Sequence, residues 1–228
     1  MNLLAIDTAH SFLSVAVSKN DEIFCERTDA AMSHSQLIML LIDEQMKKAA
    51  LAPSDLDGVL CMGGPGSFTG LRIGYSAAKA LSLSLSIPFV PVPTLDCIAH
   101  SFRNDSRLLI PVIQTNKNAW VFSIFKGNER LAPDQELSVD KFSELINEKF
   151  KNNEKITIAG PGAQQLYDGL AQEYRKLLEV SRVNANLAKE LISIAKNKNL
   201  LHNYTDAHLY SGPEYIRMSD AEAALGGA

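Results

Sequence analysis

Two segments of the chain carry the residue types that phosphate or metal chemistry would need, and the first is a polar turn at residues 7–11. This turn directly follows the apolar run of residues 3–6. A polar turn after a buried strand is a common place for a ligand-binding loop. Asp7 could hold a metal-bound or nucleophilic water near a phosphate, or it could close the strand as an Asx turn. The sequence leaves both interpretations of Asp7 open.

The second segment is the glycine-rich loop of residues 63–66 (GGPG), which separates the apolar run 59–62 from a helical pattern that begins near Gly70. A strand, a tight loop and a helix N-terminus in this order present backbone N–H groups and the positive end of a helix dipole to a ligand. The glycine spacing matches neither a P-loop, nor a dinucleotide fingerprint, nor a nucleophile elbow. The alternative is a turn that lets the helix pack tightly on a sheet. We expect Thr69 to cap this helix.

Bulk composition excludes several classes of protein. A formal net charge of −4 and a pI near 5.7 argue against strong nucleic-acid binding by this chain alone. Three cysteines without a CxxC pair favour buried thiols in a reducing cytoplasm over a disulfide framework. None of the five histidines forms an HxxxH pair, so we expect no helix-borne metal site. The first residues lack the basic and long apolar regions of a signal peptide, and we expect no membrane association.

The pattern of apolar runs predicts an α/β protein with a duplicated architecture. Residues 3–27 read as three strands joined by polar turns, which is typical of an antiparallel meander. Residues 108–131 repeat that order weakly. A polar break at residues 103–107 suggests two lobes, 1–104 and 105–228. The return of the last segment to the first lobe is left open.

Two helices in the first lobe have apolar or small-residue faces that are wider than packing on a single core requires. A helix over residues 33–50, with Ser33 as N-cap, contains six consecutive apolar residues at 37–42, which is wider than one core-facing stripe. In the helix after the glycine loop, small residues recur at steps of three and four, which lets another backbone approach closely. Both faces could also be wholly intramolecular. Further helices are expected at 139–150, 164–178 and 186–196.

Four motifs together resemble one protein family. They are AIDTA near the start, HSQ at the first helix, GGPGSFTGLRIG in the middle, and PEYIR near the end. This combination resembles the bacterial TsaB family, also called YeaZ, over almost the whole chain. The resemblance implies the actin-like fold of the Hsp70 and sugar-kinase ATPases, an RNase H-like α/β fold with two related lobes.

The resemblance also implies a function. TsaB proteins work with the homologous TsaD and the ATPase TsaE to form N6-threonylcarbamoyladenosine beside the anticodon of tRNAs that read codons starting with A, and a TsaC-type enzyme supplies threonylcarbamoyl-adenylate. TsaD carries the metal and the transfer chemistry, which implies a non-catalytic, cytoplasmic partner that meets tRNA only in the complex. It implies no cofactor of its own, and binding of ATP or ADP at the complex interface stays open. Homodimer formation by the chain alone stays open.

Individual residues follow from the resemblance position by position. Asp7 matches the first phosphate-loop aspartate of the actin-like ATPases, but Ala9 replaces a usual glycine and Gln114 falls where the second aspartate would stand. An amide cannot act as a general base or bind Mg²⁺ strongly, so we expect weak or absent ATP hydrolysis. The candidate nucleotide or phosphate loop comprises Asp7, Thr8, Gly64, Gly66, Ser67, Gly160 and Gly162. The candidate partner interface comprises Leu37, Ile38, Leu41, Gly70, Gly74, Ala77, Ala78 and Leu81.

Two other classes of function compete with this one. An actin-like ATPase or small-molecule kinase acting alone would need a carboxylate in the second lobe, which the region of Gln114 does not offer. A metallopeptidase is disfavoured because the histidines lack metal-ligand spacing. We therefore expect no catalytic and no metal-binding residues in this chain.

Overall fold

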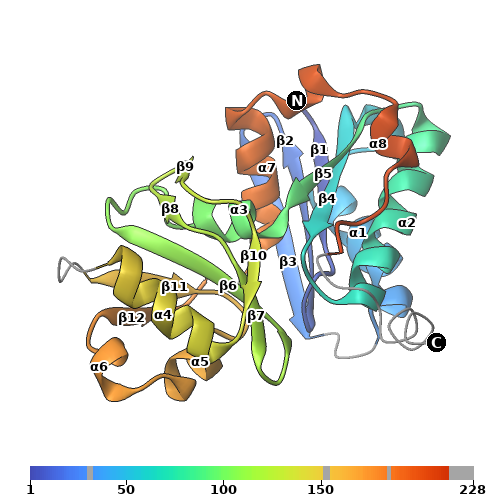
Figure 1. The fold of residues 1–228 in the computed structure, drawn as a ribbon. Helices are drawn as coiled ribbons and strands as arrows, with labels where there is room; N and C mark the ends of the chain where they lie inside the picture. The colour runs from blue at the N-terminus through green and yellow to red at the C-terminus, as the bar shows by residue number, and fades with distance from the viewer. Residues whose placement is uncertain (30–32, 151–154, 184–185, 216–228) are drawn as a thin grey trace. The chain divides into compact units, whose positions relative to one another are not determined.

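The computed structural model describes residues 1–29, 33–150, 155–183 and 186–215. The chain divides into two compact units, Met1–Cys97 with Ala185–Ala228, and Ile98–Asn184 (Figure 1). The sequence suggested a boundary at 104/105, seven residues later than this division. The described residues from 186 onwards belong to the first unit, because their helix packs on its first two strands.

The first unit is built on a five-stranded sheet in the order β3-β2-β1-β4-β5. Strands β1, β2 and β3 pair antiparallel, which confirms the expected meander, whereas β4 and β5 run parallel to β1. The unit begins with β1 (Leu3–Asp7), β2 (Phe12–Lys19), β3 (Glu22–Asp29), α1 (His34–Lys48), η1 (Pro53–Asp55), β4 (Gly58–Gly64), α2 (Phe68–Leu85) and β5 (Phe89–Pro93). The unit boundary lies within α3 (Thr94–His100), and α7 (Leu187–Asn197), η2 (Leu200–Asn203) and α8 (Ala207–Tyr210) complete the first unit.

The second unit repeats this topology. Its main strand order, β10-β7-β6-β11-β12, has β6 and β7 antiparallel and β6, β11 and β12 parallel, as their counterparts are in the first unit. Its elements are β6 (Leu108–Asn116), β7 (Ala119–Phe122), β8 (Phe125–Lys126), β9 (Glu129–Arg130), β10 (Gln135–Leu137), α4 (Val139–Lys149), β11 (Ile156–Ala159), α5 (Ala163–Gly169), α6 (Gln172–Arg175) and β12 (Leu178–Ser181). The repeat confirms the duplicated architecture that the sequence suggested.

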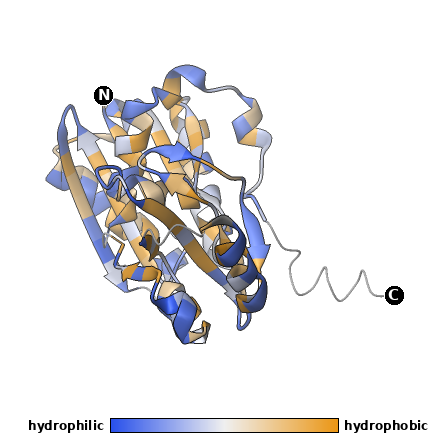
Figure 2. Ribbon diagram, turned by 60° about the vertical axis from the view of Figure 1, so that its left-hand side comes forward, coloured by the Kyte–Doolittle hydropathy of each residue, from blue (hydrophilic) through white to orange (hydrophobic). Residues whose placement is uncertain are grey.

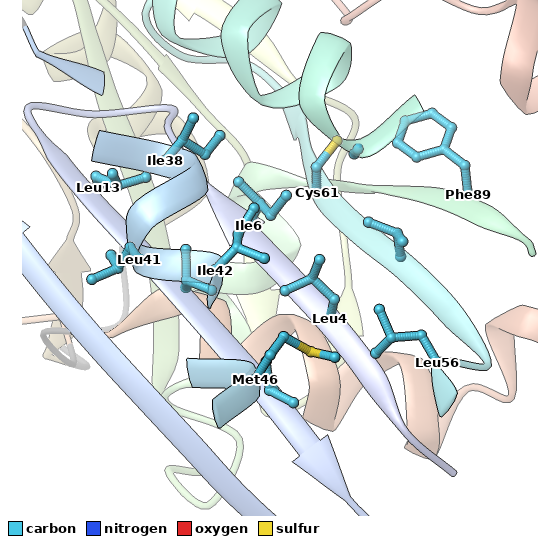
Figure 3. Close-up of a cluster of buried hydrophobic side chains, with 14 of the residues drawn as sticks. Leu4, Ile6, Leu13, Ile38, Leu41, Ile42, Met46, Leu56, Cys61 and Phe89 are labelled. Atoms are coloured by element: carbon cyan, nitrogen blue, oxygen red, sulfur yellow. The ribbon is translucent and has the colours of Figure 1, made fainter. Parts of the chain in front are cut away.

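Along the strands of the first unit, successive side chains point alternately to the two faces of the sheet. Leu4 and Ile6 of β1 pack with Ile38, Ile42 and other buried side chains of α1 (Figure 3). The same cluster contains Tyr75 and Ala78, so α1 and α2 cover the same face.

The opposite face of that sheet is covered by α7. The side chain of Ser14 on β2 points to this opposite face. Its Oγ accepts a hydrogen bond from the backbone N–H of Ala188 on α7, at 3.4 Å. The first unit therefore has three layers, with the sheet in the middle.

The core of the second unit lies between its own sheet and helices. The rings of Phe122 on β7 and Phe142 on α4 meet edge to face, with centroids 5.3 Å apart. Both side chains are nearly fully buried among residues of β6, β11 and α5. Figure 2 shows hydrophobic residues concentrated along the strands and hydrophilic residues at many of the turns.

Two local predictions are wrong. The cap of α2 is Ser67 instead of Thr69, because Ser67 Oγ accepts a hydrogen bond from the N–H of Gly70 and the helix begins at Phe68. The single helix expected over residues 164–178 is broken after Gly169, where Leu170 takes an extended conformation and buries its side chain. The following residues form the short helix α6 and the strand β12.

Candidate functional site: the junction of the sequence motifs

The turn after β1 packs directly on the start of α2. The hydroxyl of Thr8 donates a hydrogen bond to the carbonyl of Gly70, at 2.7 Å. A Cβ at Gly70 would overlap the carbonyl oxygen of Thr8, and one at Gly74 would overlap the Thr8 hydroxyl. A Cβ at Gly66 would lie 2.8 Å from the Cβ of Ala9. At these glycines, the turn after β1 therefore occupies the space that a ligand occupies in a phosphate-binding loop.

The N-terminus of α2 is satisfied by the chain itself. The N–H of Ser67 donates to the carbonyl of Ala9 at 2.7 Å, and the Ser67 hydroxyl caps the N–H of Gly70 at 3.2 Å. A capped helix start has fewer free N–H donors for an anion. Of the two interpretations of the loop, the contacts favour tight helix packing.

Asp7 closes its strand as an Asx turn. Its Oδ1 accepts the N–H of Ala9 at 3.0 Å, and Oδ2 lies 3.5 Å from the Ser14 hydroxyl, which donates to it. Burial raises the pKa of Asp7, while His10, the Ala9 N–H and Ser14 oppose that rise. Burial also lowers the pKa of His10, whose Nε2 is enclosed without a hydrogen-bond partner. The structural interpretation of Asp7 thus has direct geometric support.

The HSQ motif lies at the start of α1, beside the same end of the sheet. His34 Nε2 lies 3.3 Å from the carbonyl oxygen of Phe12, the first residue of β2. His34 also contributes to the electrostatic environment of Asp7. Ser33 takes the predicted N-cap position, but its side chain makes no capping hydrogen bond.

The described part of the PEYIR motif docks on the glycine loop and on α2. The N–H of Glu214 donates to the carbonyl of Gly63 at 2.8 Å. The Tyr215 ring lies on Phe68, with centroids 4.6 Å apart, and Arg72 Nε donates to the Tyr215 hydroxyl at 3.2 Å. Residues 216 and 217 of the motif lie outside the described residues. The four motifs that carry the resemblance therefore converge at one end of the first sheet.

Two of the candidate loop glycines belong to the second unit. Gly160 and Gly162 both have positive φ, and a Cβ at Gly160 would overlap the carbonyl of Val112. A Cβ at Gly162 would lie 2.5 Å from the Cβ of Gln114. The carbonyl of Gly162 accepts the Trp120 indole N–H at 3.0 Å. Within this unit these glycines again serve close packing on a neighbouring strand.

Most of the predicted interface residues are covered by the chain's own core. Ile38, Leu41, Gly70, Gly74 and Ala78 are buried, and they face the sheet or the turn after β1. Their assignment to a partner surface is corrected, because a residue buried in its own lobe cannot contact a partner directly. The other three predicted residues, Leu37, Ala77 and Leu81, are partly buried and border the exposed side of the helices.

The exposed apolar side chains of these helices are different residues. Met39 and Leu40 of α1 are 52% and 60% exposed, and Leu83 of α2 is 64% exposed. In addition, α2 exposes the small residues Ser76, Ala80 and Ser84. The sequence contained the signal, since Met39 and Leu40 stand in the apolar run 37–42, but only the phase of the helix identifies which members point outward. We call Leu37, Met39, Leu40, Ser76, Ala77, Ala80, Leu81, Leu83 and Ser84 the outer surface of α1 and α2.

Two further properties of the described residues bear on other functions. No group of three or more histidine, cysteine, aspartate or glutamate side chains there is arranged to hold a metal ion. Within the same residues, no helix combines the length and the apolarity needed to cross a bilayer.

Solved structures resemble the chain over nearly its full length. YeaZ from Pseudomonas aeruginosa superposes with a TM-score of 0.78 at 20% identity, over 94% of this chain and 99% of that one. Component A of (R)-2-hydroxyglutaryl-CoA dehydratase from Acidaminococcus fermentans gives 0.52 at 11% identity, over 87% and 99%. With the duplicated sheet topology, this likeness defines the class: the chain is an α/β protein of the actin-like fold.

The sequence comparisons then give the family. The family model described as "TsaD: tRNA N6-adenosine threonylcarbamoyltransferase" matches residues 27–225. The TsaB proteins of Bacillus subtilis and Escherichia coli are 27% and 25% identical, over 98% and 100% of this chain and 97% and 99% of theirs. That of Buchnera aphidicola subsp. Schizaphis graminum is 30% identical over 77% and 87%. The chain belongs to the TsaB family of tRNA threonylcarbamoyladenosine biosynthesis proteins, within the broader family of TsaD.

Proposed function

We propose that this chain is the non-catalytic partner of a TsaD homologue in forming N6-threonylcarbamoyladenosine, and that it binds this partner through the outer surface of α1 and α2. The observation that carries the proposal is the exposure of Met39, Leu40 and Leu83 on two helices that share one face of a sheet. Large apolar side chains that are exposed on the same side of two packed helices can mark an interaction site.

The shape of this surface suits a partner of the same fold. Both helices pack with their inner sides on one sheet face, so their outer sides point away from it together. Ser76, Ala80 and Ser84 follow one another at four-residue steps, so they form a line of small side chains along one side of α2. Another helix could approach α2 closely along this line. The matching family model is that of TsaD, so a TsaD homologue would present two equivalent helices. Two such pairs would form a four-helix bundle.

The contacts of Asp7 support a non-catalytic role. A general base or a Mg²⁺ ligand needs free carboxylate lone pairs directed at its substrate or ion. Asp7 instead accepts hydrogen bonds from Ala9 and Ser14, and Gln114 supplies an amide at the end of the second lobe's first strand. We assign the transfer chemistry to the TsaD homologue.

We further propose that the chain holds no cofactor of its own and that any ATP or ADP binds only in the complex. Support comes from the glycine loop, where Thr8 and Ala9 occupy the space against Gly66 and Gly70. A TsaE homologue is the expected third component, and tRNA meets the chain only through the assembly, in keeping with its net charge of −4. We place this work in the cytoplasm, where buried free thiols such as Cys61 and Cys97 are stable.

The first test is size-exclusion chromatography with light scattering on the chain alone and mixed with the TsaD homologue of the same cell. We expect a one-to-one heterodimer, and any homodimer of the chain alone should disappear as the partner is added, because both would use the same surface. The Leu40→Glu variant should fail to form the heterodimer. Leu131 is equally apolar and 49% exposed in the second unit, so Leu131→Glu is the matched control and should bind normally. An unchanged mass for the wild-type mixture would refute the proposed partner.

A further inference from the structure

A groove in the first unit runs along the free edge of β5, and the residues that line it lie outside the four sequence motifs. Its volume is about 280 Å³, and its walls come from β5, the end of α7, η2 and α8. The floor is apolar, since Val90, Val92 and Ile194 line it and are nearly fully buried. Pockets for small ligands begin at roughly 300 Å³, so the groove suits a molecule of few atoms.

At Pro91 and Pro93 the free edge of β5 offers hydrogen-bond acceptors without donors. The carbonyl of Pro88 accepts the N–H of Val59 on β4, at 2.9 Å. Backbone groups alternate in direction along a strand, so those of Pro91 and Pro93 point to the opposite, free edge. Neither proline has an N–H, which also disfavours pairing with another strand. The carbonyl of Pro91 therefore faces the groove edge as an acceptor.

Both signs of charge stand at the wall of the groove. Lys198 Nζ lies 3.7 Å from Asp96 Oδ1, which is longer than a direct charge-assisted hydrogen bond of about 2.8 Å. Asn203 and His208 add polar side chains on the side of η2 and α8. A ligand there would meet an ammonium group, a carboxylate and a hydrophobic floor at once.

We propose that this groove binds a free α-amino acid with a short aliphatic side chain. The ligand's carboxylate would pair with Lys198, its ammonium would donate to Asp96 and to the carbonyl of Pro91, and its side chain would lie on Val90 and Ile194. The site is independent of the proposed partner role, because it lies outside the outer surface of α1 and α2 and outside the motif junction.

The test is a titration of the isotopically labelled full chain, followed by ¹H–¹⁵N correlation spectra, with three probes. L-Valine carries both charges, isobutylamine only the ammonium, and isobutyrate only the carboxylate. We expect saturable shifts with L-valine, confined to residues of β5, the end of α7 and η2. Each single-charge analogue should bind at least roughly tenfold more weakly, because it loses one charged contact.

Two variants and one control locate the contacts. Asp96→Asn and Lys198→Met should each weaken L-valine binding roughly tenfold, and Asp96→Asn should leave isobutyrate binding unchanged. Lys189→Met removes an exposed lysine from α7, whose C-cap is Lys198, and should bind L-valine as the wild type does. The dispersed spectrum of each variant reports its folding in the same experiment. Absence of saturable shifts with the wild-type protein, or wild-type affinity for L-valine in the Asp96→Asn and Lys198→Met variants, would overturn the proposal.

Discussion

The hydroxyl of Thr8 donates a hydrogen bond to the carbonyl of Gly70, 62 residues further along the chain, at 2.7 Å. The carbonyl oxygen of Thr8 lies so close to Gly70 that a side chain there would overlap it. One contact thus ties the AIDTA segment to the start of α2, from which the outer surface extends. The glycine-rich loop, which resembles a ligand cradle in sequence, is filled by the protein itself.

Substitution of Gly70 by alanine should destabilise the first unit. The new Cβ meets backbone, which cannot move aside as a flexible side chain can, so we expect a loss of about 1–3 kcal/mol in the free energy of unfolding. Ser76→Ala on the exposed side of the same helix is the control and should change it by less than about 0.5 kcal/mol. Urea unfolding of both variants makes the comparison. An unperturbed Gly70→Ala protein would mean that the turn after β1 can withdraw from the helix.

The two sides of α1 should respond oppositely to truncation. Ile38 is 3% exposed within the core, so Ile38→Ala should cost about 2–5 kcal/mol of stability. Leu40→Ala should leave stability within about 0.5 kcal/mol and weaken binding to the TsaD homologue instead. Thermal unfolding and a binding titration on both variants separate the effects. A stable Ile38→Ala protein with weakened binding would instead place Ile38 in the interface, as the sequence predicts.

Sequence patterns predicted the architecture well because it depends on features that are local in the chain. The apolar runs and polar turns of residues 3–27 specify an antiparallel meander, and their repeat at 108–131 specifies the second lobe. The motifs specified the family because their combination is long and specific. The break after Gly169 was readable as a helix-ending signal, but the apolar residues beyond it extended the helical pattern.

The site was less predictable because it depends on direction and on contacts between distant residues. The run 37–42 shows that the apolar part of α1 is wider than one core-facing stripe. The packing of α1 on β2 then decides that Ile38 points inward and Leu40 outward. The small residues Gly70 and Gly74 predicted that another segment would pack closely against them. That segment is the turn of the same chain that contains Thr8. No local pattern distinguishes an internal neighbour from a partner.

His10 should make stability depend on pH below neutrality. Its pKa is lowered by burial, so the unfolded chain binds a proton at a higher pH than the folded chain does. The free energy of unfolding should therefore rise with pH up to about 6.5, the ordinary histidine value, with a slope of at most about 1.4 kcal/mol per pH unit.

The His10→Asn variant isolates this contribution. Its unfolding free energy should lose part of the rise between about pH 5 and 6.5, while His202→Asn, which alters an exposed histidine, should keep it. Asp7 acts in the opposite sense, because its raised pKa removes stability as the pH rises above its ordinary value of 3.8. Identical pH profiles of wild type and His10→Asn would show that the His10 site is open to water.

Arg72 should hold the C-terminal segment on α2. Its guanidinium carbon lies 3.9 Å from the centroid of the Phe68 ring, and its Nε donates to the Tyr215 hydroxyl. Arg72→Met should increase amide exchange of Glu214, whose N–H donates to the carbonyl of Gly63, by roughly fivefold, since such exposed contacts contribute about 1 kcal/mol. Arg27→Met removes a comparable contact with Phe12 and should leave Glu214 unchanged. Equal protection of Glu214 in all three proteins would show that the segment docks without Arg72.

The most direct measurement is threonylcarbamoyl transfer to tRNA, reconstituted with the TsaD and TsaE homologues and threonylcarbamoyl-adenylate while this chain is titrated. With Leu40→Glu, half-maximal activity should require about 30- to 100-fold more protein, with the same plateau rate, because burial of an unpaired charge weakens binding alone. Leu131→Glu should match the wild type, and Asp7→Asn should reach the wild-type plateau. A lower plateau with Asp7→Asn, or unchanged half-saturation with Leu40→Glu, would contradict a non-catalytic partner that binds through α1 and α2.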